Sequence, residues 1–367
     1  MTRLVRNRLF WPVLALLLLI ALNTASRPSF LSITVHDGAL YGSLIDVLRN
    51  SAQLMLVSVG MMLVIATRGI DLSVGALLSV SGAVTLTYIA GSPDPSSIGT
   101  VLTGITIGLV VTLVLGLWNG FLVAAIGMQP IIATLVLMLA GRGIAMLITQ
   151  GQITTIRSTP YQFIATGHLL GLPFALYISV AVVLVVALLV RRTALGMLIE
   201  AVGINPEASR LAGVRSRGII WGVYAVSGLL AGGAGILYSS NIMAADANNA
   251  GLNIELDAIL AVVIGGTSLM GGKFSISGTV VGVLILQTLT ATITFLGIPP
   301  AVTPVFKAVV VIIVCLLQSP KARSLLMGRR QRRRRASGRP QQSAASPAAS
   351  VPASDATDAT PETVVSR

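Results

Sequence analysis

A short polar segment interrupts the apolar N-terminal half of the chain at residues 67–75, which read Thr-Arg-Gly-Ile-Asp-Leu-Ser-Val-Gly. Asp71 has the greatest chemical capacity there. Its carboxylate could accept hydrogen bonds from the amides of a helix that restarts at Leu72, because helix N-termini attract acceptors and negative charge. It could instead contact a polar substrate, with Ser73 adding a hydroxyl. The sequence leaves both roles open.

A second polar segment, residues 244–257, combines carboxylates with side-chain amides. Both kinds of group exchange hydrogen bonds with neutral hydroxyls, so they suit a sugar. The same groups could equally order a re-entrant loop. Two polar residues at the edges of apolar runs, Asn119 and Thr134, have the same ambiguity. The predicted substrate path therefore consists of Asp71, Ser73, Asn119, Thr134, Asp246, Asn248, Asn249, Glu255 and Asp257.

Residues 200–214 form a segment of mostly small residues between two long apolar runs, and they carry Glu200, Glu207 and Arg210. Charges at bilayer depth cost about 3 kcal/mol each, so this segment lies outside the membrane. Its small side chains leave the backbone free to enter a groove on another protein. A transmembrane subunit would receive mechanical work from a soluble motor in this way. We expect the contacts to come from Glu200, Gly203, Asn205, Ala208 and Gly213.

Enzymatic chemistry is disfavoured. His36 and His168 are far apart in the sequence and belong to no zinc-binding His pair. The segment before Lys273 resembles a phosphate-binding loop, but Thr267 stands where the first glycine is required and Phe274 replaces the magnesium-binding hydroxyl. The chain itself is therefore expected to hydrolyse no ATP and to hold no cofactor or metal.

The elements that position these residues are membrane helices, because 54% of the 367 residues are apolar and only 10% are charged. The predicted fold is all-α, a polytopic helix bundle of about ten spans. Several of the predicted spans, notably 256–268, are too short to cross a hydrocarbon core of about 30 Å, which indicates half-helices or different span boundaries. The predicted spans are 9–26, 51–67, 72–90, 99–117, 130–148, 173–190, 219–240, 256–268, 275–296 and 301–318.

The distribution of basic residues orients this bundle. Arginines flank the first span, five more lie in the loop 191–218, and the C-terminal tail holds +7 of the net charge of +13, so all three regions should be cytoplasmic. A signal peptide is the alternative for the N-terminus, but Pro12 and a poor cleavage context favour a retained helix. The predicted organisation is a basic N-tail at 1–8, a transmembrane domain at 9–320 with a cytoplasmic loop at 191–218, a basic segment at 321–335 and a disordered tail at 336–367.

The basic cluster at residues 329–335 is expected to bind anionic lipids and no nucleic acid. Two cations fall within predicted spans. Arg142 is costly there unless paired, so it should face the bundle interior and bind carbonyls or a carboxylate. Lys307 lies near a predicted helix start and should reach outward to water.

An internal repeat relates the two halves, since residues 64–75 resemble residues 263–272. Each segment breaks an apolar run with glycines and a hydroxyl. Non-helical backbone is tolerated at membrane depth only where protein or a watery cavity surrounds it, so both breaks should line the interior. In the predicted topology both preceding helices run inward, which makes the repeat parallel.

Several motifs together resemble the permeases of bacterial ABC importers for ribose, xylose and galactose, over about residues 10–320. They are Thr67 to Gly75, Trp118-Asn119-Gly120, Gln129 to Leu135, Glu200 to Gly213 and Ile264 to Gly272. Residues 36–46 and 245–251 resemble the galactofuranose importer permeases in particular. The resemblance implies an inner-membrane permease for a monosaccharide, with residues 200–214 as the helix that couples it to an ATPase.

The resemblance also implies partners. They would be a soluble ATPase with two nucleotide-binding halves that holds ATP and magnesium, an extracytoplasmic sugar-binding protein, and a second permease, either a copy or a paralogue. One departure is Arg68, where the family usually has glycine; we expect it to pair with Asp71. The alternative function is an ion-coupled secondary transporter of a small polar solute, which would need a coupling-ion site and usually an inverted repeat.

Overall fold

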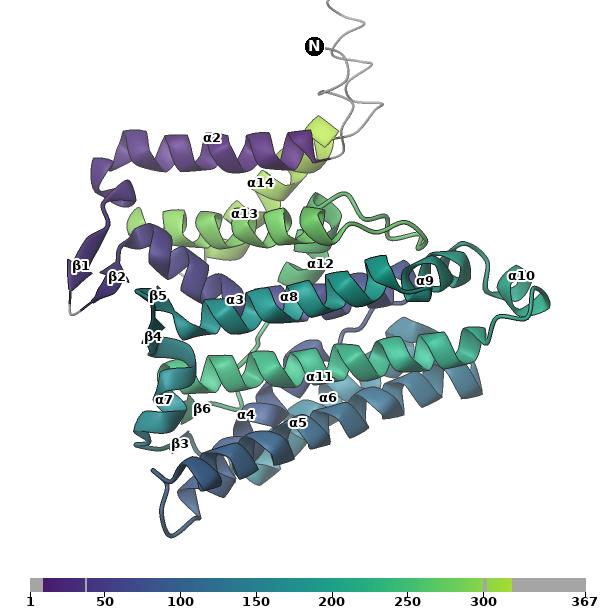
Figure 1. Ribbon diagram of the computed structural model, residues 1–367, viewed down its shortest axis with the longest axis horizontal. Coiled ribbons are helices and arrows are strands. Elements are labelled where there is room, and N and C mark those ends of the chain that lie inside the picture. The colour runs from purple at the N-terminus through teal and green to yellow at the C-terminus, as the bar shows by residue number, and fades with distance from the viewer. Residues whose placement is uncertain (1–8, 37, 300–301, 319–367) are drawn as a thin grey trace, which may run out of the picture. The chain divides into compact units, whose positions relative to one another are not determined.

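The computed structural model describes residues 9–36, 38–299 and 302–318, and helices dominate this part of the chain (Figure 1). The helices are α2 (Phe10–Ser26), η1 (Pro28–Leu31), α3 (Ser43–Ala66), α4 (Val74–Ala90), α5 (Ile98–Phe121), the π-helical turn η2 (Leu122–Ile126), α6 (Pro130–Ile148), α7 (Thr159–Thr166), α8 (Phe174–Arg192), α9 (Leu195–Ile204), α10 (Pro206–Leu211), α11 (Ser216–Ile242), α12 (Ile254–Ile264), α13 (Ile276–Phe295) and α14 (Thr303–Gln318). The predicted basic segment and tail beyond residue 320 lie outside the described residues.

Each predicted span coincides with a helix, and six of the described helices are long and apolar enough to cross a membrane. The others are shorter, and α12, with 11 residues, extends only about 16 Å. This confirms a membrane helix bundle in which α12 is too short to cross a hydrocarbon core of about 30 Å, whereas the number of ten spans stays a prediction. The largest boundary error is at α3, which begins at Ser43 and not at residue 51.

The interior of the bundle is built around α3, α4 and α11, whose side chains are mostly buried. Helix α11 packs against α3, α4 and α5. Glycines allow the closest of these contacts: a Cβ atom added to Gly228 on α11 would lie 2.8 Å from the Cα of Gly116 on α5. Four of the glycine pairs spaced by four residues, at 104/108, 116/120, 228/232 and 278/282, lie at helix contacts of this kind.

The outer helices expose apolar side chains. Leu139 on α6 is 66% exposed and Leu184 on α8 is 62% exposed, with similar residues along α5. Such surfaces are unfavourable in water and are expected where a helix faces lipid. The chain is therefore an integral membrane protein.

Within the described part of the chain, six short strands pair in twos and lie among the loops at one end of the helices (Figure 1). They are β1 (Thr34–His36) with β2 (Ala39–Tyr41), β3 (Thr154–Thr155) with β6 (Ala244–Ala245), and β4 (His168–Leu169) with β5 (Leu172–Pro173), all antiparallel. Helices α9 and α10 lie at the opposite end (Figure 1). The two ends correspond to the loops that the charge distribution assigns to opposite sides of the membrane.

Candidate functional site

The first helix break, between α3 and α4, is stabilised by hydrogen bonds within its own backbone and by the Asp71 side chain. After α3 ends, the amides of Arg68 and Gly69 donate to the carbonyls of Ile65 and Val64, both at 3.0 Å. Asp71 Oδ1 then accepts from the amide (3.1 Å) and hydroxyl (2.6 Å) of Ser73, the residue that precedes α4. The carboxylate thus caps the turn that leads into the helix, through the Ser73 amide within the restart at residues 72–75 that the sequence indicated.

Three of the other predicted path residues surround the same turn. Asn119 Nδ2 donates to Ser73 Oγ at 2.9 Å, and Thr134 Oγ1 accepts from the amide of Leu72 at 3.1 Å. The side chains of Asp71, Ser73, Asn119 and Thr134 are 0% exposed. The structure therefore brings these four residues, from the break and from α5 and α6, into one buried cluster that holds the break closed.

Sequence reasoning missed two members of this cluster on α11. Ser227 Oγ donates to Asp71 Oδ2 at 2.8 Å, which ties the break to the central helix. Tyr224 is fully buried, and a Cβ atom on Gly69 would lie 2.5 Å from its hydroxyl. Serine and tyrosine within an apolar run carry no spacing that would identify them, so only the packing of α11 reveals their role.

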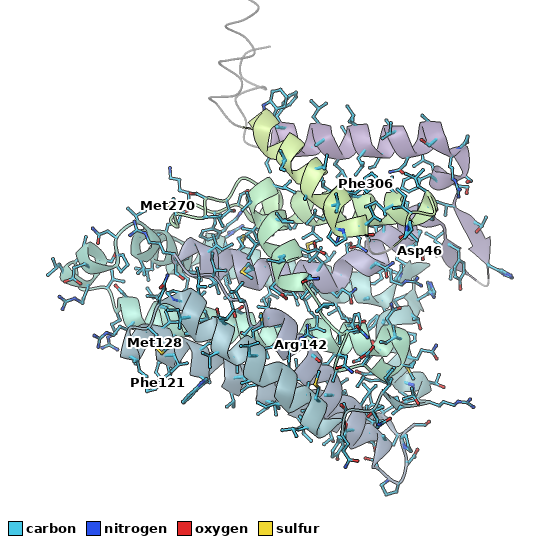
Figure 2. The ribbon with its side chains drawn as sticks, turned by 180° about the vertical axis from the view of Figure 1, so that it is seen from behind. Asp46, Phe121, Met128, Arg142, Met270 and Phe306 are labelled. Atoms are coloured by element: carbon cyan, nitrogen blue, oxygen red, sulfur yellow. The ribbon has the colours of Figure 1, made fainter. Side chains whose placement is uncertain are left out.

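The loop before α12 is ordered mainly by itself. Asp246 Oδ1 accepts from the amides of Asn248 (3.1 Å) and Asn249 (3.2 Å), and Asn249 Nδ2 donates to Asp246 Oδ2 at 2.7 Å. Arg142, which lies between the two ends of the bundle in Figure 2, donates to the carbonyls of Ala247 (3.3 Å) and Ala250 (2.6 Å). The prediction that Arg142 binds carbonyls inside the bundle is confirmed.

The two acidic residues at the start of α12 point to different surroundings. Glu255 Oε2 is buried against Gly75 at the start of α4. Asp257 Oδ2 instead accepts from Lys307 Nζ on α14 at 2.6 Å. The expectation that Lys307 reaches outward was therefore wrong, because a carboxylate on the neighbouring helix compensates its charge at lower cost than a stretch to water.

The Asp257–Lys307 pair lies in a groove of about 1020 Å³ between α12, α13 and α14. Its polar lining includes Asn253, Thr290 and Thr294, among apolar side chains such as Leu256. Asp257 is the predicted path residue that lines this groove, so here carboxylate, ammonium and hydroxyl groups together could meet a polar solute.

The predicted coupling segment consists of two helices and not one continuous segment. Asn205 separates them, and its Oδ1 accepts from the amides of Glu207 (3.1 Å) and Ala208 (3.0 Å), which caps α10. Arg210 pairs with Glu207 at the surface and lowers the pKa of that carboxyl. Asn205, Ala208 and Gly213 are exposed, as a docking surface requires.

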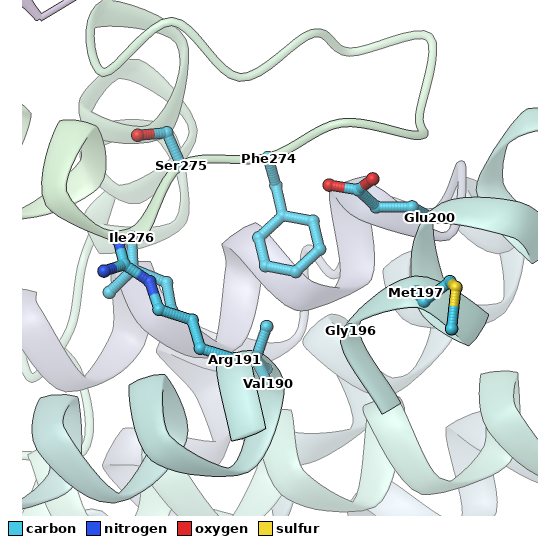
Figure 3. A pocket seen from close by; sticks show the side chains of 8 residues that line it. All are labelled: Val190, Arg191, Gly196, Met197, Glu200, Phe274, Ser275 and Ile276. Atoms are coloured by element: carbon cyan, nitrogen blue, oxygen red, sulfur yellow. The ribbon is translucent and has the colours of Figure 1, made fainter. Parts of the chain in front are cut away.

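Glu200 lies on α9 at the edge of a cavity of about 340 Å³ (Figure 3). Arg191 and Phe274 line the same cavity, so the end of α8, the start of α13 and the coupling segment meet there. In Figure 3 the Phe274 ring lies between the charged ends of Glu200 and Arg191.

Gly203 is buried against the chain's own backbone. A Cβ atom there would collide with the Ala66 carbonyl oxygen and would lie 2.6 Å from the amide nitrogen of Gly272. In this conformation Gly203 therefore offers no surface to a partner, whatever it contributes to coupling. The amide of Gly272 also donates to the Ala66 carbonyl at 2.9 Å, so the first break, the second break and the end of α9 meet directly.

Arg68 lies where the two breaks and the end of α9 meet. Its guanidinium donates to the carbonyls of Met270 (3.2 Å from Nε) and Ile204. Figure 2 places Met270 near one end of the helices and Asp46 near the other. The expected Arg68–Asp71 ion pair was wrong, because Asp71 faces inward to Ser73 and Ser227 while Arg68 is exposed.

The second break repeats the backbone pattern of the first. The amides of Gly266 and Thr267 donate to the carbonyls of Val263 (2.9 Å) and Val262 (3.2 Å). Gly266 has a φ of +85°, and Arg68 at the matching position has a φ of +66°. Helix α3 ends at the first break and α12 ends at the second. The geometry therefore agrees with a parallel repeat in which Arg68 matches Gly266.

Among the described residues, no cluster of three or more His, Cys, Asp or Glu side chains could hold a metal ion. The chain matches the family model described as "Branched-chain amino acid transport system / permease component" over residues 43–315. No solved structure is significantly similar to it.

The relatives that cover most of the chain include three sugar permeases. It is 48% identical over 321 residues to the galactofuranose transporter permease protein YtfT of Escherichia coli K12, covering 86% of this chain and 92% of that protein. The fructose import permease protein FruF of Bifidobacterium longum is 43% identical (87% and 90% covered), and the ribose import permease protein RbsC of Escherichia coli K12 is 36% identical (84% and 93% covered). The chain belongs to the family of branched-chain amino acid transport system permease components, and it is itself a transporter subunit.

Proposed function

We propose that this chain is the permease subunit of an ABC importer for a monosaccharide, galactofuranose before fructose or ribose. The observation that carries the proposal is the 48% identity to a galactofuranose permease over 92% of that protein. The three relatives named above are sugar permeases, so their substrates guide the proposal more closely than the amino acids in the family's description. The setting is a bacterial inner membrane, with both termini in the cytoplasm.

The groove with Asp257 and Lys307 supports a role in the substrate path. It offers both donors and acceptors to hydroxyl groups. A second permease, either another copy or a paralogue, would close the groove and complete the path. Asp71, Ser73, Asn119 and Thr134 would then act by holding the helix break, since they are buried in this conformation.

The exposed surface of α10 supports a docking role. Glu207, Ala208 and Arg210 project from the end of the molecule that the charge distribution places in the cytoplasm. An ATPase with two nucleotide-binding halves would bind ATP and magnesium, engage α10, and shift the permease between outward-open and inward-open states by its different affinity for each. A sugar-binding protein would deliver the substrate at the opposite end, and the basic cluster at 329–335 would contact anionic lipids.

Reconstitution tests this proposal. The full chain, co-purified with its cognate ATPase and sugar-binding protein, would be placed in liposomes and supplied with radiolabelled galactose, fructose, ribose or leucine. We expect ATP-dependent accumulation of a sugar and not of leucine, with galactose preferred through its furanose form. Accumulation driven by an ion gradient without ATP would support the secondary transporter instead.

A further inference from the structure

Arg68 occupies a backbone conformation that side chains rarely adopt. Its φ of +66° lies in the left-handed region, where a Cβ atom crowds the neighbouring carbonyl. Glycine avoids this crowding, and Gly266 occupies the matching position of the second break. An arginine here is unfavourable for the local backbone, so its side chain has to make contacts that compensate.

Those contacts join segments that are far apart in the sequence. The guanidinium donates to the carbonyl of Met270, 202 residues away, and to that of Ile204, 136 residues away. Met270 belongs to the second break, and Ile204 is the last residue of α9. Hydrogen bonds from an ionised donor are stronger than neutral ones, so one side chain on the first break holds both other segments.

The backbone closes the same junction from the other side. The Gly272 amide donates to the Ala66 carbonyl at 2.9 Å, and Gly203 packs against both residues. We refer to residues 66–68, 203–204 and 270–272 as the three-segment junction. Helix α4 begins a few residues after the first segment of this junction, and α13 begins a few residues after the last segment. A movement of α9 would therefore be transmitted to the starts of both helices through this junction.

We propose that Arg68 is a positioning residue that clamps the coupling segment to both helix breaks, so that a movement of α9 displaces the starts of α4 and α13 together. The proposal rests on the importer function proposed above. Without the clamp, the Gly272–Ala66 hydrogen bond and the packing of Gly203 still hold the junction, but the 265–275 loop is freer to move independently of α9.

The variant Arg68→Gly tests the clamp without straining the fold, because glycine adopts a positive φ readily. In the reconstituted complex we expect the amount of sugar imported per ATP hydrolysed to fall by about fivefold or more. A lower amount of folded complex would not change this ratio. Arg68→Lys keeps the charge but lacks the planar fork that reaches two carbonyls, so it should give an intermediate ratio.

Gln150→Gly is the matched control. Gln150 is exposed, has a φ of +54°, and lies outside the junction. Its replacement relieves the same kind of backbone strain and should leave the ratio of sugar to ATP unchanged. An unchanged ratio in Arg68→Gly, or an equal loss in Gln150→Gly, would overturn the coupling role.

A distance measurement tests the clamp independently of transport. Spin labels on cysteines at Leu211 and Leu269, which are 77% and 47% exposed, would be placed in a Cys315→Ala chain within the whole complex. We expect a narrow distance distribution with Arg68 and a broad one with Arg68→Gly. Equal distributions would overturn the clamp. A wild-type complex without ATP-driven uptake would refute the proposed function and leave this measurement valid.

Discussion

Asp71 receives three hydrogen bonds and is fully buried, which favours a role in holding a helix break together. A buried carboxylate in a membrane protein is expensive unless its acceptor capacity is satisfied. The donors come from the next turn and from α11, so the residue links local backbone geometry to the central helix.

Two substitutions at Asp71 separate capping from substrate contact. Asp71→Asn keeps an oxygen for Ser73 and should retain most uptake, whereas Asp71→Leu leaves Ser73 and Ser227 without their acceptor, at about 1–3 kcal/mol for each stranded group. We expect the Leu variant to lower the thermal stability of the purified complex. Normal stability in both variants with uptake abolished in both would instead indicate contact with the sugar.

Gly75 is a second residue at which adding one methyl group should lower the stability of the protein. A Cβ atom there would collide with the Glu255 carboxylate and lie 2.6 Å from the Gly251 carbonyl oxygen. We expect Gly75→Ala to destabilise the protein by about 1–3 kcal/mol through overpacking. Thermal unfolding of the detergent-solubilised protein measures this effect.

Gly143 on α6 is the control for Gly75, because no heavy atom lies within 4 Å of its added Cβ. Gly143→Ala should be neutral or stabilising, by up to about 1 kcal/mol, since alanine favours a helix. Equal unfolding temperatures for the two alanine variants would contradict the close packing of α4 on α12.

The two helices of the predicted coupling segment, α9 and α10, differ in exposure. Helix α10 is exposed and presents Glu207, Ala208 and Arg210, whereas the end of α9 is buried at the three-segment junction through Gly203. If α10 docks on an ATPase as proposed, contact with that partner and transmission to the breaks would involve two different helices, joined at Asn205.

Tryptophan should disturb folding at Gly203 but not at Ala208. Ala208→Trp adds bulk at the surface, so the permease should remain folded but lose its ATPase on co-purification. Gly203→Trp would collide with the Ala66 carbonyl and should reduce the amount of folded permease even without a partner. Full retention of the ATPase by Ala208→Trp would exclude this face of α10 as the docking surface.

The Asp257–Lys307 pair ties α12 to α14, and its side chains are only 24% and 16% exposed. Removing one partner leaves the other charge uncompensated, so Asp257→Asn or Lys307→Met should each destabilise the protein by about 3 kcal/mol. The double variant should regain part of this loss. Strictly additive losses in a double-mutant cycle would show that the two residues are not coupled.

At the scale of the whole molecule, the exposed apolar faces of α5, α6 and α8 surround an interior built on α3, α4 and α11. Cysteines at Leu211 and Leu170, 77% and 90% exposed, lie at opposite ends of this bundle. In a Cys315→Ala background, an impermeant thiol reagent should label Leu211→Cys from the cytoplasmic side and Leu170→Cys from the outer side. Labelling of both from one side would overturn the predicted orientation.

Composition and local chemistry determined the elements of this protein. Long apolar runs can satisfy their backbone in a membrane only as helices, so the positions of the helices followed from the sequence, as did the glycine-marked breaks and the short α12. The carbonyl contacts of Arg142 also followed from the sequence, because a cation within a span needs acceptors nearby. The polar residues of the predicted path were identified by type alone, without their partners.

Tertiary structure decided which of these residues meet. Ser227 and Asp71, or Arg68 and Met270, lie more than 150 residues apart, and no local pattern records such a contact. Residues two positions apart on a helix point about 200° apart, so Glu255 and Asp257 had to face different sides of α12. Only the packing shows that one side meets Gly75 and the other meets Lys307. For the same reason the sequence could identify Gly203 as small but not show that Ala66 and Gly272 require it to be small.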